Sequence, residues 1–435
     1  MAPTELVAAV RRGDAEAVRE LLDAGADPET CDPADGTPLL CLAVAAYDEK
    51  VAEALIAAGA DPLRPLPDGD TPLLRAVDGG STEITAALLP QTVRLTPEAR
   101  AELLDRARFW AGTGTGTGLA AELRRRTGAP GPAARTRVED PDAFCHYEQI
   151  TLGGLTVRDG HAGVLIGLEE SFGVGAPFDE VVARALVRPD RGHAVWTEAV
   201  VRLSWRGHEA TWADAADLRD HPDRLRRLFA ADLLRLMAVS GPHDGYRPPA
   251  GRDIALFFPW ASKEEDPEVL ALVLDAVIDE GEGYAEDIEA LGLRYATHPD
   301  PRVRCVVPSL LSGDEGSADA PSARLKALYA LARDPDPAVR ERAAYGLTHV
   351  RGDAPGIEDA LAGLLDDELR ETRVHAARGL ALRGDPRCVD AKRRLLPLDP
   401  DGWPDGDLVR AMWTYEQTTA AEAGEERERP FRTGA

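Results

Sequence analysis

Residues 13–40 read GDAEAVRELLDAGADPETCDPADGTPLL, and residues 47–74 read YDEKVAEALIAAGADPLRPLPDGDTPLL. The triplet Gly-Ala-Asp that begins at Gly25 recurs at Gly59, which is 34 residues later. Self-similarity at such a period is the sequence signature of a repeat architecture, in which each unit buries its apolar face against its neighbours. The N-terminal part of the chain is therefore predicted to be an array of repeated units.

Each unit carries its own start and stop signals. Thr37 and Thr71 precede a proline and a leucine, and threonine followed by proline is typical of a helix start. Gly25 and Gly59 follow a second apolar helix, where a glycine in the left-handed conformation ends it. The Asp-Pro and Asp-Gly pairs that come next favour a protruding turn. We therefore expect two helices and one turn in each unit.

This pattern resembles the ankyrin repeat over about residues 4–92, with two well-marked units and a degenerate third that starts at Thr71. The family's usual T-P-L-H has Leu40 and Leu74 in place of histidine, so the histidine hydrogen bonds that join neighbouring repeats are missing. Two to three repeats are near the minimum for independent stability. We expect this array to depend on the residues that follow it.

A different repeat fills the C-terminal half. Residues 298–304 read HPDPRVR, and residues 334–340 read DPDPAVR. Residues 340–347 read RERAAYGL, and residues 373–380 read RVHAARGL. Apolar residues between these anchors recur at helical spacing. The second half of the chain is therefore also predicted to be a helical array.

The second pattern resembles the HEAT repeat over about residues 193–395, with an extension back to about residue 140. The resemblance implies two antiparallel helices in each unit, with Asp-Pro before the second helix. It also implies that an arginine in the first turn of that helix pairs with an acid of a neighbouring repeat. These arginines are Arg227, Arg304, Arg340 and Arg373, while Leu270 stands at the equivalent position of one unit.

We predict an all-α fold, a double α-solenoid in which a short ankyrin-repeat array precedes a HEAT-repeat array. The predicted parts are residues 1–92 (ankyrin array), 93–137 (a helix and a Gly/Pro/Arg-rich basic linker), 138–400 (HEAT array) and 401–435 (a C-terminal helix and a disordered tail after about residue 416). The glycine run at 112–118 is expected to hold no regular structure, and residues 111–137 are expected to form a mobile linker or loop. Residues 144–157 fit either a β-hairpin turning at Gly153-Gly154 or an irregular entry to the HEAT array.

Charge restricts the partners. The formal net charge is −26, which disfavours nucleic acid and anionic membranes. The sequence contains no apolar run long enough to span a membrane, and its start lacks the apolar stretch of a signal peptide, so we expect a cytoplasmic protein. The five cysteines form no C-x-x-C pair and are expected to be free thiols.

The segment between the two arrays is basic. Residues 91–137 hold 9 basic and 4 acidic side chains, whereas residues 1–90 hold 6 basic and 17 acidic ones. One interpretation is that this strap lies against the acidic arrays and neutralises them. The alternative is a docking segment for an acidic partner or for nucleic acid, through the arginine strap at 124–137.

The sequence shows no pattern typical of a catalytic or metal site. The glycine run lacks the Gly-Lys-Ser/Thr of a phosphate loop, a single His-Glu pair exists, and H-E-x-x-H and G-x-S-x-G are absent. We therefore predict no catalytic residues, no metal and no cofactor. The alternative is an enzyme or enzyme accessory with a site near residues 193–217. Its candidate side chains, which helical spacing more often places in a core, are Trp196, Glu198, Trp205, His208, Trp212 and Asp214.

The predicted function is a protein–protein interaction adaptor, scaffold or inhibitory partner that binds another protein or peptide. Its oligomeric state does not follow from the sequence. Solenoids present long surfaces whose residues vary without loss of the fold. On the concave face of the HEAT array the candidate contacts, which we expect to project away from the buried stripe, are Arg342, Tyr345, His349, His375 and Arg378. At the ankyrin turns the candidates are Glu29, Asp32, Asp35, Arg64, Asp68 and Asp70.

Overall fold

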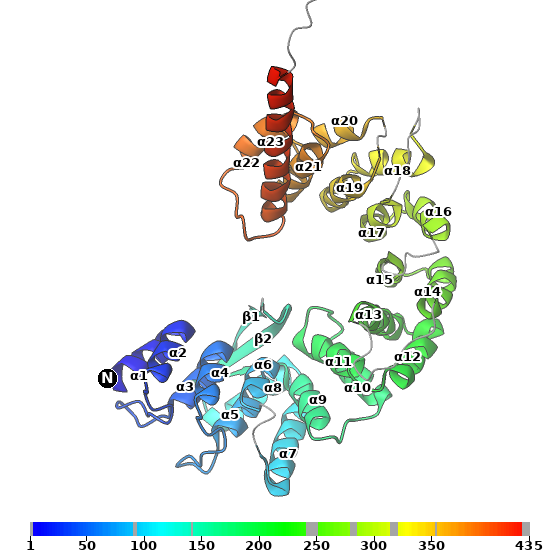
Figure 1. Cartoon of the computed structure of the whole chain (residues 1–435). Coiled ribbons are helices and arrows are strands. Elements are labelled where there is room, and N and C mark those ends of the chain that lie inside the picture. Colours follow the sequence, from blue (N-terminus) through cyan, green and yellow to red (C-terminus); the bar gives the residue numbers. More distant parts are fainter. Residues whose placement is uncertain are drawn as a thin grey trace, which may run out of the picture. The chain divides into compact units, whose positions relative to one another are not determined.

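The computed structural model describes residues 3–89, 94–140, 142–240, 251–278, 285–313, 321–352 and 355–428 (Figure 1). The chain forms two compact units, and the boundary between them falls after Leu218. We call them the N-terminal unit and the C-terminal unit. Residues 138–218 thus pack with the ankyrin-like helices rather than with the repeats that follow them.

The N-terminal unit is built mainly of short helices. Its helices are α1 (Pro3–Arg12), α2 (Ala15–Asp23), α3 (Leu39–Ala46), α4 (Glu49–Ala57), α5 (Pro72–Gly79), α6 (Thr82–Ala87), α7 (Pro97–Thr113), α8 (Gly116–Thr127), α9 (His161–Ser171), α10 (Phe178–Ala185), α11 (Ala194–Ser204) and α12 (His208–Asp217). Its strands are β1 (Ala134–Asp140), β2 (Cys145–Leu152) and β3 (Leu155–Arg158).

The predicted start and stop signals of the ankyrin units are mostly confirmed. The Thr71 hydroxyl accepts a hydrogen bond from the Leu74 amide at 3.1 Å, so Thr71 caps α5. Gly25 and Gly59 have φ angles of 91° and 101°, the left-handed values that end a helix. The expectation for Thr37 is wrong. Helix α3 starts at Leu39 with Pro38 as its cap, so Thr37 lies one position too early to cap it.

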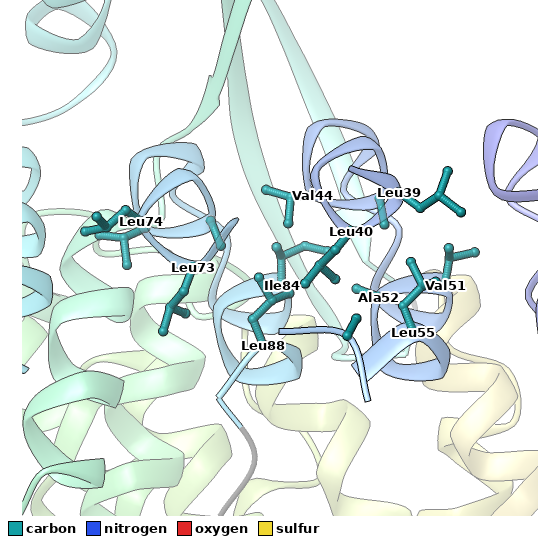
Figure 2. Close-up of a cluster of buried hydrophobic side chains, with 14 of the residues drawn as sticks. Leu39, Leu40, Val44, Val51, Ala52, Leu55, Leu73, Leu74, Ile84 and Leu88 are labelled. Carbon is teal, nitrogen blue, oxygen red and sulfur yellow. The ribbon is translucent and has the colours of Figure 1, made fainter. Parts of the chain in front are cut away.

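The ankyrin helices share one core with helices that follow them. Leu40 and Leu74, which replace the family's histidine, are buried among the aliphatic side chains of α3 to α6 (Figure 2). The same cluster contains Leu103, Leu104 and Ala107 of α7, and Val164, Leu165 and Leu168 of α9. The array therefore completes its core with α7 and α9, which confirms the expected dependence on later residues.

The expected absence of regular structure around the glycine run is wrong. Helix α7 continues to Thr113, and α8 already begins at Gly116. Gly114 has a φ of 84°, and a Cβ on Gly118 would lie 1.9 Å from the Thr113 carbonyl oxygen. The glycines are thus needed for a very tight turn between two helices, and the sequence after Gly118 is rich in good helix formers.

A three-stranded antiparallel sheet interrupts the helices, in the order β1–β2–β3. The turn between β2 and β3 is Gly153-Gly154, with φ angles of 61° and 84°. Two positive φ angles match the right-handed twist of the flanking strands. The hairpin alternative is therefore confirmed. Apart from this sheet the described elements are helical, in agreement with the predicted all-α solenoid.

The C-terminal unit is a stack of helices in two layers (Figure 1). One layer contains α13 (Arg224–Ser240), α15 (Pro267–Ile278), α17 (Pro301–Leu311), α19 (Pro337–His349), α21 (Arg370–Leu382) and α23 (Asp405–Glu428), each packed on the next. We call it the odd layer. The other contains α14 (Arg252–Lys263), α16 (Ala285–Tyr295), α18 (Ala323–Leu331), α20 (Ile357–Ala362) and α22 (Arg387–Leu395).

The predicted side chains hold the odd layer together. Val339, Ala343, Leu347 and Val350 are all buried, as the helical spacing of α19 predicts. Helix α23 continues to Glu428, so the disordered tail expected after about residue 416 is wrong over that stretch. Residues 429–435 of the predicted tail lie outside the described residues.

An arginine ladder joins successive repeats. Three of the four predicted arginines form ion pairs with an acid of the next repeat: Arg227 with Glu264 (2.9 and 2.9 Å), Arg304 with Asp334 (2.7 and 2.7 Å) and Arg340 with Asp367 (2.6 and 3.5 Å). These acids are almost fully buried in their side chains. Two-point contacts of this kind combine charge with fixed geometry.

The same guanidinium groups also bind their own repeat. Arg304 donates to the carbonyl oxygens of His298 and Pro299 at 2.8 and 3.0 Å, in the turn just before α17. Arg227, Arg340 and Arg373 make the equivalent contacts five and six residues upstream. At the end of the stack a different arginine binds the acid of the next helix. Arg370 rather than Arg373 pairs with Asp405, at 2.6 and 2.7 Å.

Glycine permits close contact between neighbouring helices of the odd layer. A Cβ on Gly346 of α19 would lie 2.9 Å from the Pro308 Cβ and 3.1 Å from its carbonyl oxygen, on α17. The equivalent Gly379 of α21 faces Thr348 and Leu361 in the same way. The shared Gly-Leu of the repeats therefore marks a helix contact.

We predict that Gly346→Ala lowers the stability of this region by about 1–3 kcal/mol, because overpacking costs that much in a well-packed core. Amide hydrogen exchange of the full chain measures it, as lost protection in α17 and α19. Gly363→Ala is the control, since a Cβ there meets nothing nearer than 3.5 Å. Equal protection in the two variants would contradict the prediction.

The ladder also predicts a pH dependence. Burial raises the pKa of Asp334, but the hydrogen bonds from Arg304 and from the Asp336 amide, together with the charges of Arg304 and Arg340, outweigh it and hold the pKa below its usual value. A carboxyl group whose pKa is lowered by folding stabilises the fold fully above its unfolded pKa of about 3.9. That contribution is lost as the pH falls from there through the folded pKa.

We therefore expect the urea midpoint of the C-terminal transition to fall between pH 5 and pH 3. Arg304→Met removes the partner of a buried carboxylate, which costs about 3 kcal/mol at pH 7. Because the pKa of Asp334 is then no longer lowered, the variant's midpoint falls less between pH 5 and pH 3. Parallel pH curves for the two proteins would rule out this account.

Candidate interaction surfaces

The acids at the ankyrin turns mostly bind other parts of the N-terminal unit. The Glu29 carboxylate accepts from the Asp61 amide at 2.6 Å and from Arg64 at 2.7 Å, so it joins two neighbouring turns. Asp68 pairs with Arg75 at 2.7 Å. These predicted contact residues therefore already have partners within the chain.

Three further turn acids differ in exposure. Asp32 is 2% exposed and pairs with Arg11, so the expectation that it projects from a loop tip is wrong. Its burial follows from its own turn, since it also accepts from the Ala34 amide at 2.9 Å. Asp70 pairs with Arg106 at 2.9 Å. Asp35 is exposed, and hydrogen bonds from Thr37 lower its pKa.

The basic strap neutralises acids of the ankyrin helices. The Asp78 carboxylate of α5 accepts from Arg106 of α7 at 2.9 Å, from Arg126 of α8 at 3.0 Å and from the Trp110 indole at 2.6 Å. The Arg126 guanidinium also lies 4.4 Å from the Trp110 ring centre. The interpretation that this segment lies against an acidic array is thus confirmed for the N-terminal unit.

Other arginines of the strap are also paired. Hydrogen bonds from Arg125 and then from Arg126 lower the pKa of Glu122 to about 2, against the effect of burial. Arg135 pairs with Glu148 at 3.2 Å, and Arg124 donates to the Gly131 carbonyl at 2.7 Å. These guanidinium groups therefore already have hydrogen-bond partners within the chain.

The hairpin between β2 and β3 lies beside the helices α3 and α5. The Tyr47 hydroxyl contacts the carbonyl oxygens of Gly79 and Thr156 at 2.9 and 3.1 Å, and the Arg158 guanidinium lies 4.1 Å from the Tyr47 ring centre. A cavity of about 490 Å³ remains between these elements. This face of the ankyrin array is thus partly covered by the chain itself.

A larger cavity of about 630 Å³ lies among α7, α9, α10 and α11. Its charged lining is balanced, because Arg108, Arg184 and Arg188 face Asp159, Glu169 and Glu180. Arg184 pairs with Glu169 at 2.6 Å, and Arg188 pairs with Asp159. The basic and acidic groups of the lining neutralise one another, so the cavity does not present charge of one sign to a ligand.

Histidine 161 borders this cavity. Burial lowers its pKa to about 4, and its ring stacks on Trp110 with centres 4.7 Å apart. Its Nε2 contacts the Asp78 carbonyl oxygen at 3.0 Å, which places it in the same polar network as the strap. No signal in the sequence marks this histidine, because its neighbours come from distant segments.

The described side chains of the enzyme-like cluster do not converge on one site. Trp196 is fully buried in the core, whereas Trp205 is 54% exposed beside Arg202. Glu198 pairs with Arg202 at 2.7 Å and lines a cavity of about 240 Å³. Trp212 is half-buried and Asp214 exposed on α12. The His208 side chain lies outside the described residues.

On the C-terminal unit, the structure brings most of the predicted HEAT residues together. The rings of Tyr345 and His349 lie 4.3 Å apart on α19, and Tyr345 lies 5.3 Å from His375 on α21. Trp403, from the loop before α23, lies 5.3 Å from His375 and is 65% exposed. These four rings form a row across two helices and a loop, which we call the aromatic row.

One member of the row departs from the prediction. His375 is fully buried rather than projecting from the surface, because Trp403 lies over it and Glu341 approaches its Nε2 at 3.2 Å. The sequence gives no signal for Trp403, which reaches the row from an irregular loop. The exposed rings of the row are therefore His349 and Trp403, with Tyr345 half-buried between them.

Two arginines flank the row with weak ion pairs. Arg342 is 53% exposed in its side chain, and its contact with Glu341 is 3.6 Å. Arg378 on α21 lies 3.6 Å from Asp407, beyond hydrogen-bond distance, and its Nη1 is buried without a hydrogen-bond partner. In contrast, the three ladder arginines that pair with an acid, Arg227, Arg304 and Arg340, have a contact at 2.6 to 2.9 Å.

Comparisons with known families match both halves. The family model described as ankyrin repeats (3 copies) matches residues 6–98, and the model described as HEAT repeats matches residues 324–412. The chain joins ankyrin repeats to HEAT repeats. This confirms the predicted resemblances. The repeats built by α13, α15 and α17 lie outside the HEAT match and extend the same helix stacking.

Solved structures resemble the chain only distantly. An X-ray structure of YibA from E. coli has a TM-score of 0.40 and 19% identity, and the alignment covers 57% of this chain and 87% of that one. A chain from a structure of the Pds5-Scc1 complex has a TM-score of 0.33 and 13% identity, with coverage of 94% and 66%. None of the curated proteins compared with this sequence matches it.

The described part of the chain lacks both a membrane-spanning helix and a metal-binding cluster. None of its helices is both long enough and apolar enough to cross a membrane. Within the same residues, no cluster of three or more His, Cys, Asp or Glu side chains has the arrangement of a metal site.

We predict that Asp78→Asn weakens the attachment of the strap by about 1–3 kcal/mol, because it leaves hydrogen-bonding groups of three neighbours poorly paired. Faster amide exchange in α7 and α8 would show this. Asp105→Asn is the matched control, since Asp105 is exposed and pairs only within its own helix. If both variants exchange alike, Asp78 does not hold the strap.

Proposed function

We propose that this chain is a non-catalytic protein-binding scaffold whose partner surface is the odd layer of the C-terminal unit at α19 and α21. Ankyrin and HEAT repeats are protein-interaction motifs, which supports the general class. The surface itself is proposed from its residues. It comprises Arg342, Tyr345, His349, Arg378 and Trp403.

The observation that carries the proposal is a contrast in pairing. The turn acids and strap arginines of the N-terminal unit are largely satisfied inside the chain. On α19 and α21, Arg342 and His349 are exposed, and Arg378 has no close acid. Aromatic residues and arginines provide most of the binding energy at protein interfaces. This surface has both, within one patch.

Affinity capture from native lysate tests the proposal with the full chain. We expect one partner in stoichiometric amount, and we expect Arg342→Ala, Tyr345→Ala and His349→Ala together to reduce its recovery at least tenfold. The control is Arg393→Ala, an exposed arginine on α22 in the other layer. Equal recovery with the triple variant and the control would refute the assignment of this surface.

The same experiment separates the other functions considered for the sequence. Co-purified nucleic acid, released by salt, would favour the arginine strap instead. A co-purified small molecule in place of a protein would favour the cavities of the N-terminal unit. Loss of the partner on replacing Asp35, the exposed turn acid, would assign binding to the ankyrin array.

A further inference from the structure

We infer that the patch around the aromatic row binds an extended acidic peptide, with carboxylates three residues apart. The inference rests on the proposed function and adds the chemistry of the partner. It follows from the two arginines that flank the row, from the rings between them and from the spacing of the two helices.

The arginines are the first argument. Three guanidinium groups of the ladder have a carboxylate within 3 Å, whereas the acids that pair with Arg342 and Arg378 lie at 3.6 Å. The Nη1 of Arg378 is buried and lacks an acceptor. A buried donor without a partner costs free energy. Because the Arg378 side chain is 18% exposed, a small shift of its guanidinium group would bring it to a ligand oxygen. Guanidinium pairs best with a carboxylate, which accepts two hydrogen bonds.

The repeat alignment places the two arginines on the same face. Counted from the ladder arginine of each helix, Arg342 stands two positions after Arg340, and Arg378 stands five positions after Arg373. Positions three apart lie on one side of a helix. Tyr345 occupies on α19 the position that Arg378 occupies on α21. The arginines therefore stand diagonally across the α19–α21 contact, with Tyr345 next to both.

Spacing then sets the length of the peptide. The axes of packed helices lie about 8–10 Å apart. The positions of Arg342 and Arg378 also differ by about one turn along the axis, so they lie about 10–11 Å apart. An extended chain of the polyproline II type has three residues per turn and rises about 3.1 Å per residue, so side chains three residues apart lie on one face and span about 9 Å. The two residues between the acids would lie on the aromatic row, where proline or an aromatic ring packs best.

A peptide array tests this inference with the full chain. The array carries Asp-x-x-Asp peptides with all residues at x, the matching Asn-x-x-Asn peptides, and Asp pairs one and five residues apart. We expect the Asp-x-x-Asp set to bind at least fivefold better than the other sets. Proline and aromatic residues should be enriched at x.

Variants of the two arginines complete the test. Arg342→Ala is on the surface and should lower binding of the Asp-x-x-Asp set at least fivefold without changing the fold. Arg378→Lys keeps the charge but loses the planar two-point contact, and should lower binding at least threefold. Arg393→Ala should bind as the native chain does, and circular dichroism checks that all three fold alike.

The outcomes separate the inference from the proposed function. If peptides bind without a preference for Asp, or if Arg342→Ala binds as well as the native chain, the acidic-peptide inference is wrong. The proposed surface still stands in that case if the triple variant at 342, 345 and 349 loses the bound peptides. If the triple variant keeps them too, both ideas are wrong. If no peptide binds, the acidic-peptide inference is wrong, and the capture experiment with the triple variant alone decides on the proposed surface.

Discussion

The C-terminal unit depends on one interaction, in which a single guanidinium group is shared between two repeats. Arg304 binds the carbonyl oxygens of the turn that precedes its own helix and, at the same time, the Asp334 carboxylate of the next repeat. The turn and the stacking are therefore fixed by one side chain. Because the charge is largely removed from water, the contact requires both sets of acceptors to be in place.

The N-terminal unit also uses arginine–carboxylate contacts, here to attach helices to an array that cannot complete its own core. Its ankyrin array is too short to close its own core, and α7 and α9 supply the missing apolar surface. The Asp78 carboxylate of α5 would be left beside those helices without a neutralising partner. Arg106 and Arg126 neutralise it, and Trp110 adds an indole donor. Apolar and polar contacts thus attach the same helices to the array.

Much of the fold could be predicted from the sequence, because the same motifs for helix starts, helix ends and contacts between repeats recur along the chain. The period of 34 residues, the Asp-Pro before Val-Arg and the Thr71 cap each describe contacts between residues near in sequence or in adjacent repeats. The interpretation was wrong at Gly112–Gly118, where glycine permits a tight turn between helices rather than preventing them. Composition alone cannot distinguish those two uses of glycine.

The candidate surface was harder to predict, for a related reason. Helical spacing groups Arg342, Tyr345 and His349 correctly, since these lie on one helix. It cannot show that Trp403 covers His375, because the loop before α23 has no periodicity to place it. Nor can it show which arginines have near partners. The distances that distinguish Arg342 and Arg378 from the ladder depend on acids from other repeats.

The change of arginine at Asp405 has a consequence for how the stack ends. Three earlier repeats present an acid to the ladder arginine of the repeat before them, namely Glu264, Asp334 and Asp367, but α23 presents its acid to Arg370. The contact between α21 and α23 is therefore made about one helical turn earlier on α21 than the ladder position. A change that weakens the ladder arginines would thus leave the attachment of the last helix to the stack in place.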